Sequence, residues 1–473
     1  MPPCTVKGRN TMEQNTYCNP IPLPDLPRGI DEALLGLRDS DRDYCSVSDP
    51  DGYYINGVWY IFTSYGGAYS SRDLMHWESH TLEGINEIYY GPAVLELGGR
   101  FYFTACKIGV YVADSPFGPY KKAGDFRLPD GSAPAAIDDP DFFADDDGRV
   151  YLFWGCGADG IMGAELDRND PAQMISEPQS LIRFDSSHKW ERWGEYNQDT
   201  DVGWTEGVCM IKRGGRYYLN YAACGTTFSR YATGTYYSDT SPLGGFVYQK
   251  NNPVIAKSAG LARGGGHSCI IADDSGAMWA FYTCINGYSH RFERVIGMDK
   301  ITVEDGELYC ETSDFPRGTD GAARVDLQPL TFLSLASASG CAPGRDAVYA
   351  ADESMLSFWQ PAAEDVEPWL EISFRGEYRA GAYRIIRRDL GLDFDAGIVP
   401  EPLCYRVYLQ TPDGGWQLAA DMWDIAEVKM IDYHQTTPTV ALAARLVLKK
   451  TDRTKNTAIV SFTVFGSKNG GAG

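Results

Sequence analysis

The sequence lacks any run of eighteen apolar residues, and its first eighteen residues include Lys7, Arg9 and Glu13 in place of a continuous apolar segment. A membrane-spanning helix needs about 20 consecutive apolar residues, and a secretory signal needs an uninterrupted apolar core. The chain therefore predicts neither feature, and we expect a cytoplasmic location.

Basic residues are also in short supply. The chain has 42 lysines and arginines against 64 aspartates and glutamates, a formal net charge of −22. Such a surface repels nucleic acid and anionic membranes, so both are excluded as expected partners. The net charge does not exclude uncharged partners. The excess of acidic residues is also what an ordinary soluble protein surface has.

Histidine is scarce, with six residues, and no Cys-x-x-Cys pair occurs among the twelve cysteines. Both facts disfavour a zinc site. Half of the cysteines lie in or beside apolar strand-like runs, namely Cys106, Cys156, Cys209, Cys224, Cys269 and Cys284. We expect them to be buried free thiols.

What the sequence does contain is a repeat. An anchor residue is followed by an apolar run, a glycine turn eight or nine positions later, and a second run rich in aromatic residues. The five anchors are Asp49, Gly91, Asp139, Glu206 and His267, and their turns fall at Gly57, Gly99, Gly148, Gly215 and Gly276. Successive anchors are 42 to 67 residues apart, about the length of a four-stranded propeller blade with insertions.

This pattern predicts an all-β protein with a five-bladed β-propeller followed by a β-sandwich (jelly-roll) domain. Short alternating strand-like runs follow the last repeat, as a sandwich requires. We expect an extended arm over residues 1–30, the propeller over 31–312 with a short helix at its start (31–37), a linker over 313–330, the sandwich over 331–468 and a disordered tail over 469–473.

The first strand of each blade lines the axis of a propeller, so the anchors are predicted to converge there. Asp49, Asp139, Glu206 and His267 would meet, and Gly91 would leave room. A proline follows Asp49 and Asp139, which predicts an extended backbone at both anchors. The alternative for Asp49 is an ordinary Asx–Pro turn.

Two further stretches invite a functional interpretation. The run Asp145–Gly148 is better explained as a turn than as a calcium loop, because it lacks the distal glutamate. The aromatic-rich insertion over residues 187–198 is a candidate pocket rim, with simple packing as the alternative.

Converging carboxylates fit glycosidic bond hydrolysis. One ionised carboxylate takes a proton from water while one protonated carboxyl group donates a proton to the leaving oxygen. A third carboxylate beside the acid raises its pKa and keeps it protonated.

Four ordered motifs carry a resemblance to a known family: Ser48-Asp49-Pro50, Asp139-Pro140-Asp141 with Asp146-Asp147-Gly148, Thr205-Glu206-Gly207 and Gly266-His267-Ser268. Together they resemble glycoside hydrolase family 43. The resemblance implies inversion, with Asp49 as general base, Asp139 as pKa modulator and Glu206 as general acid.

The same resemblance implies that His267 helps to hold a central calcium ion or water cluster, although the family often has glycine where Ser268 stands. It also implies substrate contacts from Arg291 or Arg294, and we expect Trp204, Tyr65 and Trp154 to contact the sugar. The second domain is similar to discoidin-type sandwiches, through Ala350-Ala351-Asp352, Ser357-Phe358-Trp359 and residues 462–466.

The expected activity is removal of terminal pentose units from plant-derived oligosaccharides by an inverting exo-acting enzyme, an α-L-arabinofuranosidase, a β-xylosidase or both. The alternatives are an exo-β-D-galactofuranosidase, a phosphorolytic five-bladed enzyme and a non-catalytic glycan-binding propeller. The sequence leaves the oligomeric state open.

Overall fold

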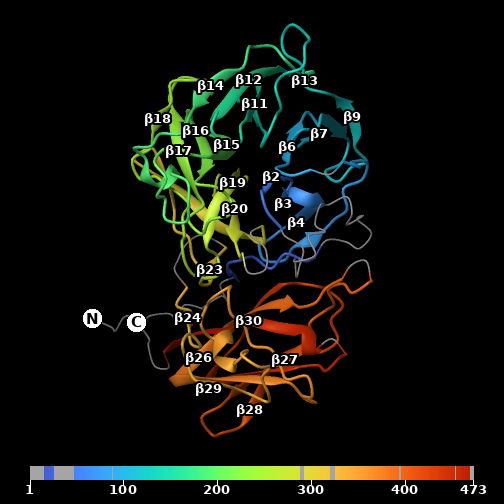
Figure 1. Ribbon diagram of the computed structural model, residues 1–473, viewed down its shortest axis with the longest axis vertical. Helices are drawn as coiled ribbons and strands as arrows, with labels where there is room; N and C mark the ends of the chain where they lie inside the picture. The colour runs from blue at the N-terminus through green and yellow to red at the C-terminus, as the bar shows by residue number, and fades with distance from the viewer. Residues whose placement is uncertain are drawn as a thin grey trace, which may run out of the picture.

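The computed structural model describes residues 15–25, 47–87, 89–287, 292–319, 325–393, 396–452 and 454–468, and these form an all-β molecule of two parts (Figure 1). Helical structure in these ranges is limited to the 3-10 turns η1 (Ser64–Gly66), η2 (Lys189–Glu191), η3 (Ala347–Ala350) and η4 (Thr454–Asn456). None of the described helices is long and apolar enough to cross a membrane. The short helix predicted over 31–37 and the tail 469–473 lie outside the described residues.

The larger part is a five-bladed propeller, as predicted, and each blade is one antiparallel sheet whose first four strands pair in chain order, while a fifth strand of blade three pairs with the third strand of that blade. Blade one comprises β2 (Asp51–Ile55), β3 (Val58–Thr63), β4 (Gly67–Ser71) and β5 (Glu78–Ser79). Blade two comprises β6 (Ala93–Leu97), β7 (Arg100–Thr104), β8 (Val110–Ala113) and β9 (Lys121–Gly124). Blade three comprises β10 (Asp141–Ala144), β11 (Val150–Trp154), β12 (Ile161–Asp167), β13 (Asp170–Met174) and β14 (Gln179–Ile182). Blade four comprises β15 (Thr205–Arg213), β16 (Arg216–Ala223), β17 (Ala232–Ser238) and β18 (Val247–Tyr248). Blade five comprises β19 (Gly264–Ala272), β20 (Met278–Ile285), β21 (Arg294–Glu304) and β22 (Glu307–Cys310).

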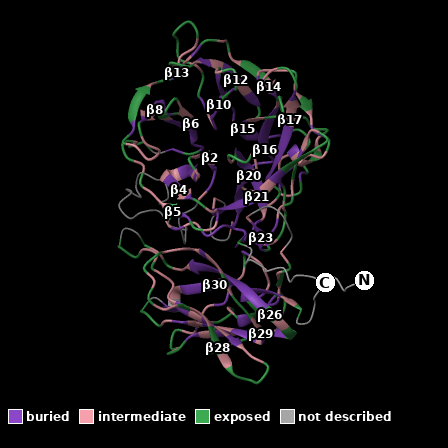
Figure 2. Ribbon diagram, turned by 180° about the vertical axis from the view of Figure 1, so that it is seen from behind, coloured by how far each residue is buried: buried purple, intermediate pink, exposed green. Residues whose placement is uncertain are grey.

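The local sequence explains the hairpins. Asn56 and Gly57 both have positive φ, 52° and 79°, and join β2 to β3 as a two-residue turn whose twist matches its strands. Gly214 and Gly215 join β15 to β16 in the same way, with φ of 60° and 83°. The strands after these turns are rich in aromatic and β-branched residues and are largely buried, because each blade packs against its neighbours (Figure 2).

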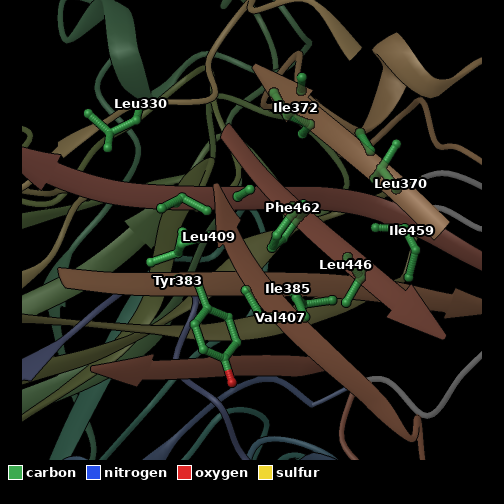
Figure 3. Packing of buried hydrophobic residues seen from close by; sticks show 14 of the residues in the cluster. Leu330, Leu370, Ile372, Tyr383, Ile385, Val407, Leu409, Leu446, Ile459 and Phe462 are labelled. Carbon is green, nitrogen blue, oxygen red and sulfur yellow. The ribbon is translucent and has the colours of Figure 1, made fainter. Parts of the chain in front are cut away.

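The smaller part is one seven-stranded sheet formed by β24 (Gln328–Pro329), β25 (Ala336–Ala338), β26 (Trp369–Asp389), β27 (Tyr405–Gln410), β28 (Trp416–Met422), β29 (Ile431–Leu448) and β30 (Thr457–Lys468). The long strand β26 contains register shifts that bend it. Its two halves supply Ile372 and Ile385 to the same core, which Phe462 of β30 completes (Figure 3). The sheet therefore folds over its own apolar face, as a sandwich does.

The two parts share a hydrophobic core. One cluster of buried side chains contains Tyr282 and Ile270 of the propeller together with Phe358, Ile386 and Val460 of the sandwich. A continuous apolar core makes the junction rigid rather than a flexible hinge.

The described part of the N-terminal arm packs on blades one and five of the propeller, where Tyr17 lies in one core cluster with Trp59 and Trp279, and it also reaches the sandwich. β1 (Thr16–Tyr17) pairs with β23 (Arg317–Gly318), and the amide of Asp25 donates a hydrogen bond to the carbonyl of Val428 in the sandwich. The segment 313–330, predicted as a linker, thus contains β23 and also β24, which pairs with β30.

Candidate active site

The anchor residues share an unusual backbone. Asp49, Asp139 and His267 all have positive φ, at 54°, 47° and 39°. The extended backbone predicted for the two aspartates from their following prolines is therefore wrong. Aspartate tolerates the left-handed region better than most residues, and strain of this kind concentrates at functional sites.

In blades two and four, the residue with positive φ at the anchor position is a glycine. Gly91 has φ of 55°, and a Cβ there would lie 2.7 Å from Oδ1 of Asp139, so this glycine does leave room for the carboxylate. In blade four the residue with φ of 55° is Gly207, where a Cβ would lie 2.7 Å from the His267 ring. The residue of blade four that is equivalent to the other anchors is therefore Gly207, and Glu206 directly precedes it. A register shift follows Glu206 in β15.

Asp49 lies beside a buried cation. Nη1 of Arg294 donates a hydrogen bond to its Oδ1 at 3.1 Å, and both side chains are almost fully buried. The hydroxyls of Ser64 and Ser48 donate to its other oxygen at 2.6 and 2.9 Å. Burial alone would raise the pKa of Asp49, but the charges of Arg294 and His267 and these hydroxyls outweigh burial and lower the pKa. Asp49 is therefore ionised at neutral pH.

Glu206 lies beside a second carboxylate. Burial raises the pKa of Glu206, and the negative charge of Asp139 raises it further. Hydrogen bonds oppose this rise: Tyr231 donates its hydroxyl to Oε1 at 2.7 Å, and Trp204 donates its ring N–H to Oε2 at 2.7 Å. The thiol of Cys156 also donates to Oε2, at 3.3 Å.

Asp139 lies near both Asp49 and Glu206. Nδ1 of His267 is 3.5 Å from Oδ2 of Asp139 and 3.5 Å from Oδ1 of Asp49, so the two aspartate oxygens are no more than about 7 Å apart. Oxygens of Asp139 and Glu206 come within 4.8 Å of each other. Burial first, and then the charge of Asp49, raises the pKa of Asp139 to about 7. The pair formed by Asp139 and Glu206 therefore retains a proton near neutral pH.

All three carboxylates line one pocket of about 250 Å³, although the first and the last are 157 positions apart in the sequence. The first strands of the blades, which follow or contain the anchors, surround the middle of the propeller (Figure 1). The predicted convergence of Asp49, Asp139, Glu206 and His267 is therefore what the structure shows.

Only some of the other residues predicted to contact the sugar line the pocket. Tyr65 and Arg294 line the pocket. Trp204 stands beside it, where it orients Glu206 and packs on Trp193 of the aromatic insertion. Trp154 is a correction: its side chain is buried in the core cluster shared by blades two and three, because β11 is covered on both faces. Arg291 lies outside the described residues.

Sequence reasoning missed several residues of the site. Tyr90, Thr226 and Phe292 also line the pocket, and the thiol of Cys156 faces it. Tyr231, the residue directly before β17, donates its hydroxyl to Glu206. None of these positions belongs to the anchor repeat, so no periodic signal pointed to them.

A calcium ion at His267 gains no direct support from the surrounding donors. Calcium takes six to eight oxygen ligands. Among the described residues, the group of three side chains close enough to hold an ion is Asp139, Cys156 and Glu206, which includes sulfur and leaves out His267. The calcium site therefore stays a prediction.

Comparison with known proteins agrees with this geometry. The model of the family described as "Glycosyl hydrolases family 43" matches residues 34–308, more than half of the chain. The chain belongs to glycosyl hydrolase family 43. It is a glycoside hydrolase, and oligosaccharides are its class of substrate.

The relatives that the chain resembles are named for action on different sugars. The chain is 22% identical over 324 residues to an extracellular endo-α-(1→5)-L-arabinanase of Thermotoga petrophila, covering 53% of this chain and 68% of that protein. It is 25% identical over 272 residues to the β-D-galactofuranosidase xynD of Aspergillus niger, covering 50% and 73%. A crystal structure of a thermostable family-43 glycoside hydrolase aligns with a TM-score of 0.50 at 20% identity, over 63% of this chain and 97% of that one. The last comparison supports the fold alone. The similarity of the second domain to discoidin-type sandwiches stays a prediction.

Proposed function

We propose that this protein is an inverting, exo-acting glycoside hydrolase that releases terminal pentose units, as an α-L-arabinofuranosidase, a β-xylosidase or both. The observation on which this depends most is the opposite shift of two pKa values within one pocket, lowered at Asp49 and raised at Glu206. One group is thus ready to accept a proton and the other to donate one.

The proposed reaction uses these two groups together. Glu206 gives its proton to the glycosidic oxygen as the bond from that oxygen to the anomeric carbon breaks. Water attacks the anomeric carbon from the opposite face, and Asp49 accepts the proton that the water loses. The new bond forms on the other face, so the configuration inverts. Asp49 then releases its proton to solvent, and Glu206 takes one up.

Asp139 and His267 tune this pair. Because Asp139 and Glu206 share a proton near neutral pH, the reactive form in this proposal is the one in which Asp139 is ionised, and its charge then keeps the proton on Glu206. Its position is fixed because its own N–H donates to the sulfur of Cys106 at 3.0 Å and Oδ2 accepts from the N–H of Gly207 at 3.2 Å. His267 lies between both aspartates, with Nδ1 3.5 Å from an oxygen of each, and it is one of the causes that lower the pKa of Asp49.

Exo action is supported by the size of the pocket. Its volume of about 250 Å³ lies below the range of about 300–1,000 Å³ that is usual for small-molecule pockets, which favours a site for a single terminal sugar unit. The named activities of relatives, which include xylosidase/arabinosidase and xylan 1,3-β-xylosidase, support a pentose as the terminal unit.

Galactofuranose is the second candidate, because the Aspergillus niger relative is named a β-D-galactofuranosidase. Phosphorolysis is disfavoured, since Arg294 is the one lysine or arginine among the described pocket residues and it is paired with Asp49. A non-catalytic binder would have no need of two oppositely tuned carboxyl groups.

The test is a panel of 4-nitrophenyl glycosides, α-L-arabinofuranoside, β-xyloside and β-galactofuranoside, followed by linear arabino- and xylo-oligosaccharides. We expect turnover of at least one pentoside and release of monosaccharide from chain ends. Cleavage of internal bonds only, or hydrolysis of the galactofuranoside alone, would contradict the proposal.

The calcium prediction has its own test. Loss of turnover in EDTA with recovery on adding Ca²⁺ would support an ion at His267. Unchanged turnover would contradict a metal-binding role for His267.

A further inference from the structure

Glu293, the residue directly before Arg294, is held by an arginine of the sandwich domain. Nη1 of Arg388, near the end of β26, donates a hydrogen bond to its Oε1 at 2.9 Å. Neither side chain exposes any surface. A buried carboxylate and a buried guanidinium hold each other firmly, because separating them would leave a charge uncompensated in the interior.

The backbone of Glu293 is held as well. Its carbonyl accepts hydrogen bonds from the N–H groups of Asn286 and Gly287 at 2.9 and 3.3 Å. The residues on either side, Phe292 and Arg294, both line the pocket. Glu293 is therefore the fixed point between two residues of the active site.

We propose that Arg388 is a positioning residue for catalysis: by fixing Glu293, the sandwich domain holds Arg294 against Asp49 and Phe292 in the pocket wall. Adjacent residues in a strand are about 3.3 Å apart, so a displacement of Glu293 moves Arg294 with it. The 3.1 Å contact between Arg294 and Asp49 is lost if Arg294 shifts by about 1 Å. The inference rests on the proposed role of Asp49 as general base, and it makes the second domain part of the catalytic machinery.

The chain offers a matched control. Arg384 lies four residues earlier on the same strand, is also fully buried and also pairs with a carboxylate, Glu353, at 2.6 Å. It further donates to the carbonyls of Asn19 and Asp314, at 2.6 and 2.7 Å. None of these partners lines the pocket. Loss of Arg384 loosens the same interface without a direct connection to Arg294.

The experiment compares two double variants of the full chain, Arg388→Met/Glu293→Met and Arg384→Met/Glu353→Met. Each replaces a whole buried ion pair with apolar side chains, which preserves folding better than removing one partner. In the Arg388 variant we expect the acid limb of the kcat/KM profile to move up by about 0.5–1 pH unit, because Asp49 loses part of the stabilisation that a nearby cation gives. We also expect kcat/KM to fall at least about tenfold in that variant. In the Arg384 variant we expect an unchanged acid limb.

A second variant and a second readout make the test decisive. Arg388→Lys keeps the charge and is expected to fall between the parent and the Arg388 double variant. Hydrogen–deuterium exchange of peptides covering residues 292–300 should rise in the Arg388 double variant and stay at the parent level in the Arg384 one, a result that does not depend on activity.

Folded Arg388 variants with an unchanged acid limb and unchanged exchange would overturn the inference. An equal shift in both double variants would overturn it too, because it would reduce Arg388 to one of several interface contacts. Failure of the proposed function would give a different result. The loss of kcat/KM at low pH would then not depend on Asp49 even in the parent enzyme.

Discussion

Asp49 and Glu206 stand in the same pocket with nearly equal exposure, 5% and 6%, yet their neighbours carry opposite charge. Asp49 has a guanidinium and two hydroxyls, whereas Glu206 has a second carboxylate. Burial acts on both in the same direction, so it cannot make one a base and the other an acid. The difference comes from Arg294 on one side and Asp139 on the other, and each prediction below removes one element of this contrast.

The largest effect is expected when the acid itself is removed. Glu206→Gln should lower kcat roughly 10²–10⁴-fold on natural oligosaccharides, the usual contribution of general acid catalysis. The loss should be far smaller on 4-nitrophenyl glycosides, whose leaving group departs without a proton. Asp49→Asn should lose a similar factor on both substrate types. Steady-state kinetics on the two types checks this, and an equal loss for Glu206→Gln on both would contradict its role.

Removal of the cation beside Asp49 comes next. Arg294→Met should raise the pKa of Asp49, and a nearby opposite charge is worth about 1–3 pKa units. A general base must be ionised, so activity that is lost as the pH falls would now be lost at a higher pH. The pH profile of kcat/KM measures this shift, and Arg294→Lys, which keeps the charge, is the control. An acid limb that stays in place would rule out this electrostatic role.

The mirror-image change is made at Asp139. Glu206 must carry its proton, so activity falls as the pH rises through its pKa. Asp139→Asn removes the charge that raises this pKa, and the basic limb should move to lower pH by about one unit. The basic limb should also fit a single ionisation, because Asp139 and Glu206 titrate as a coupled pair in the parent enzyme. A shift to higher pH would contradict the account.

Sequence reasoning reached the parts of the site that repeat. The anchors follow a shared blade geometry, so the convergence of Asp49, Asp139 and His267 was predictable from their distance to a glycine turn. The prediction failed where a feature is set by one blade alone. Trp154 belongs to an aromatic strand, and only the stacking of neighbouring blades decides that it is core. Tyr231 is brought to Glu206 by the path of the chain into β17. The preference set by a following proline gave the wrong backbone for Asp49 and Asp139, because it is a local bias and both residues have positive φ in the folded protein.

The smallest predicted effect belongs to the hydrogen bonds on Glu206. Tyr231→Phe removes a donor that favours the ionised form, and one such bond is worth about 1 kcal/mol, or about 0.7 pKa unit. The pKa of Glu206 should rise, and the basic limb should move to higher pH by less than one unit. The direction is opposite to that of Asp139→Asn, so the two profiles measured side by side check both signs.

The most direct measurement is the anomeric configuration of the first product, followed by ¹H NMR as a pentoside is hydrolysed. A base at Asp49 that activates water and an acid at Glu206 that protonates the leaving oxygen on the other face together predict that the inverted anomer appears first and then mutarotates. Initial formation of the retained anomer would contradict the assignment of Asp49 as general base.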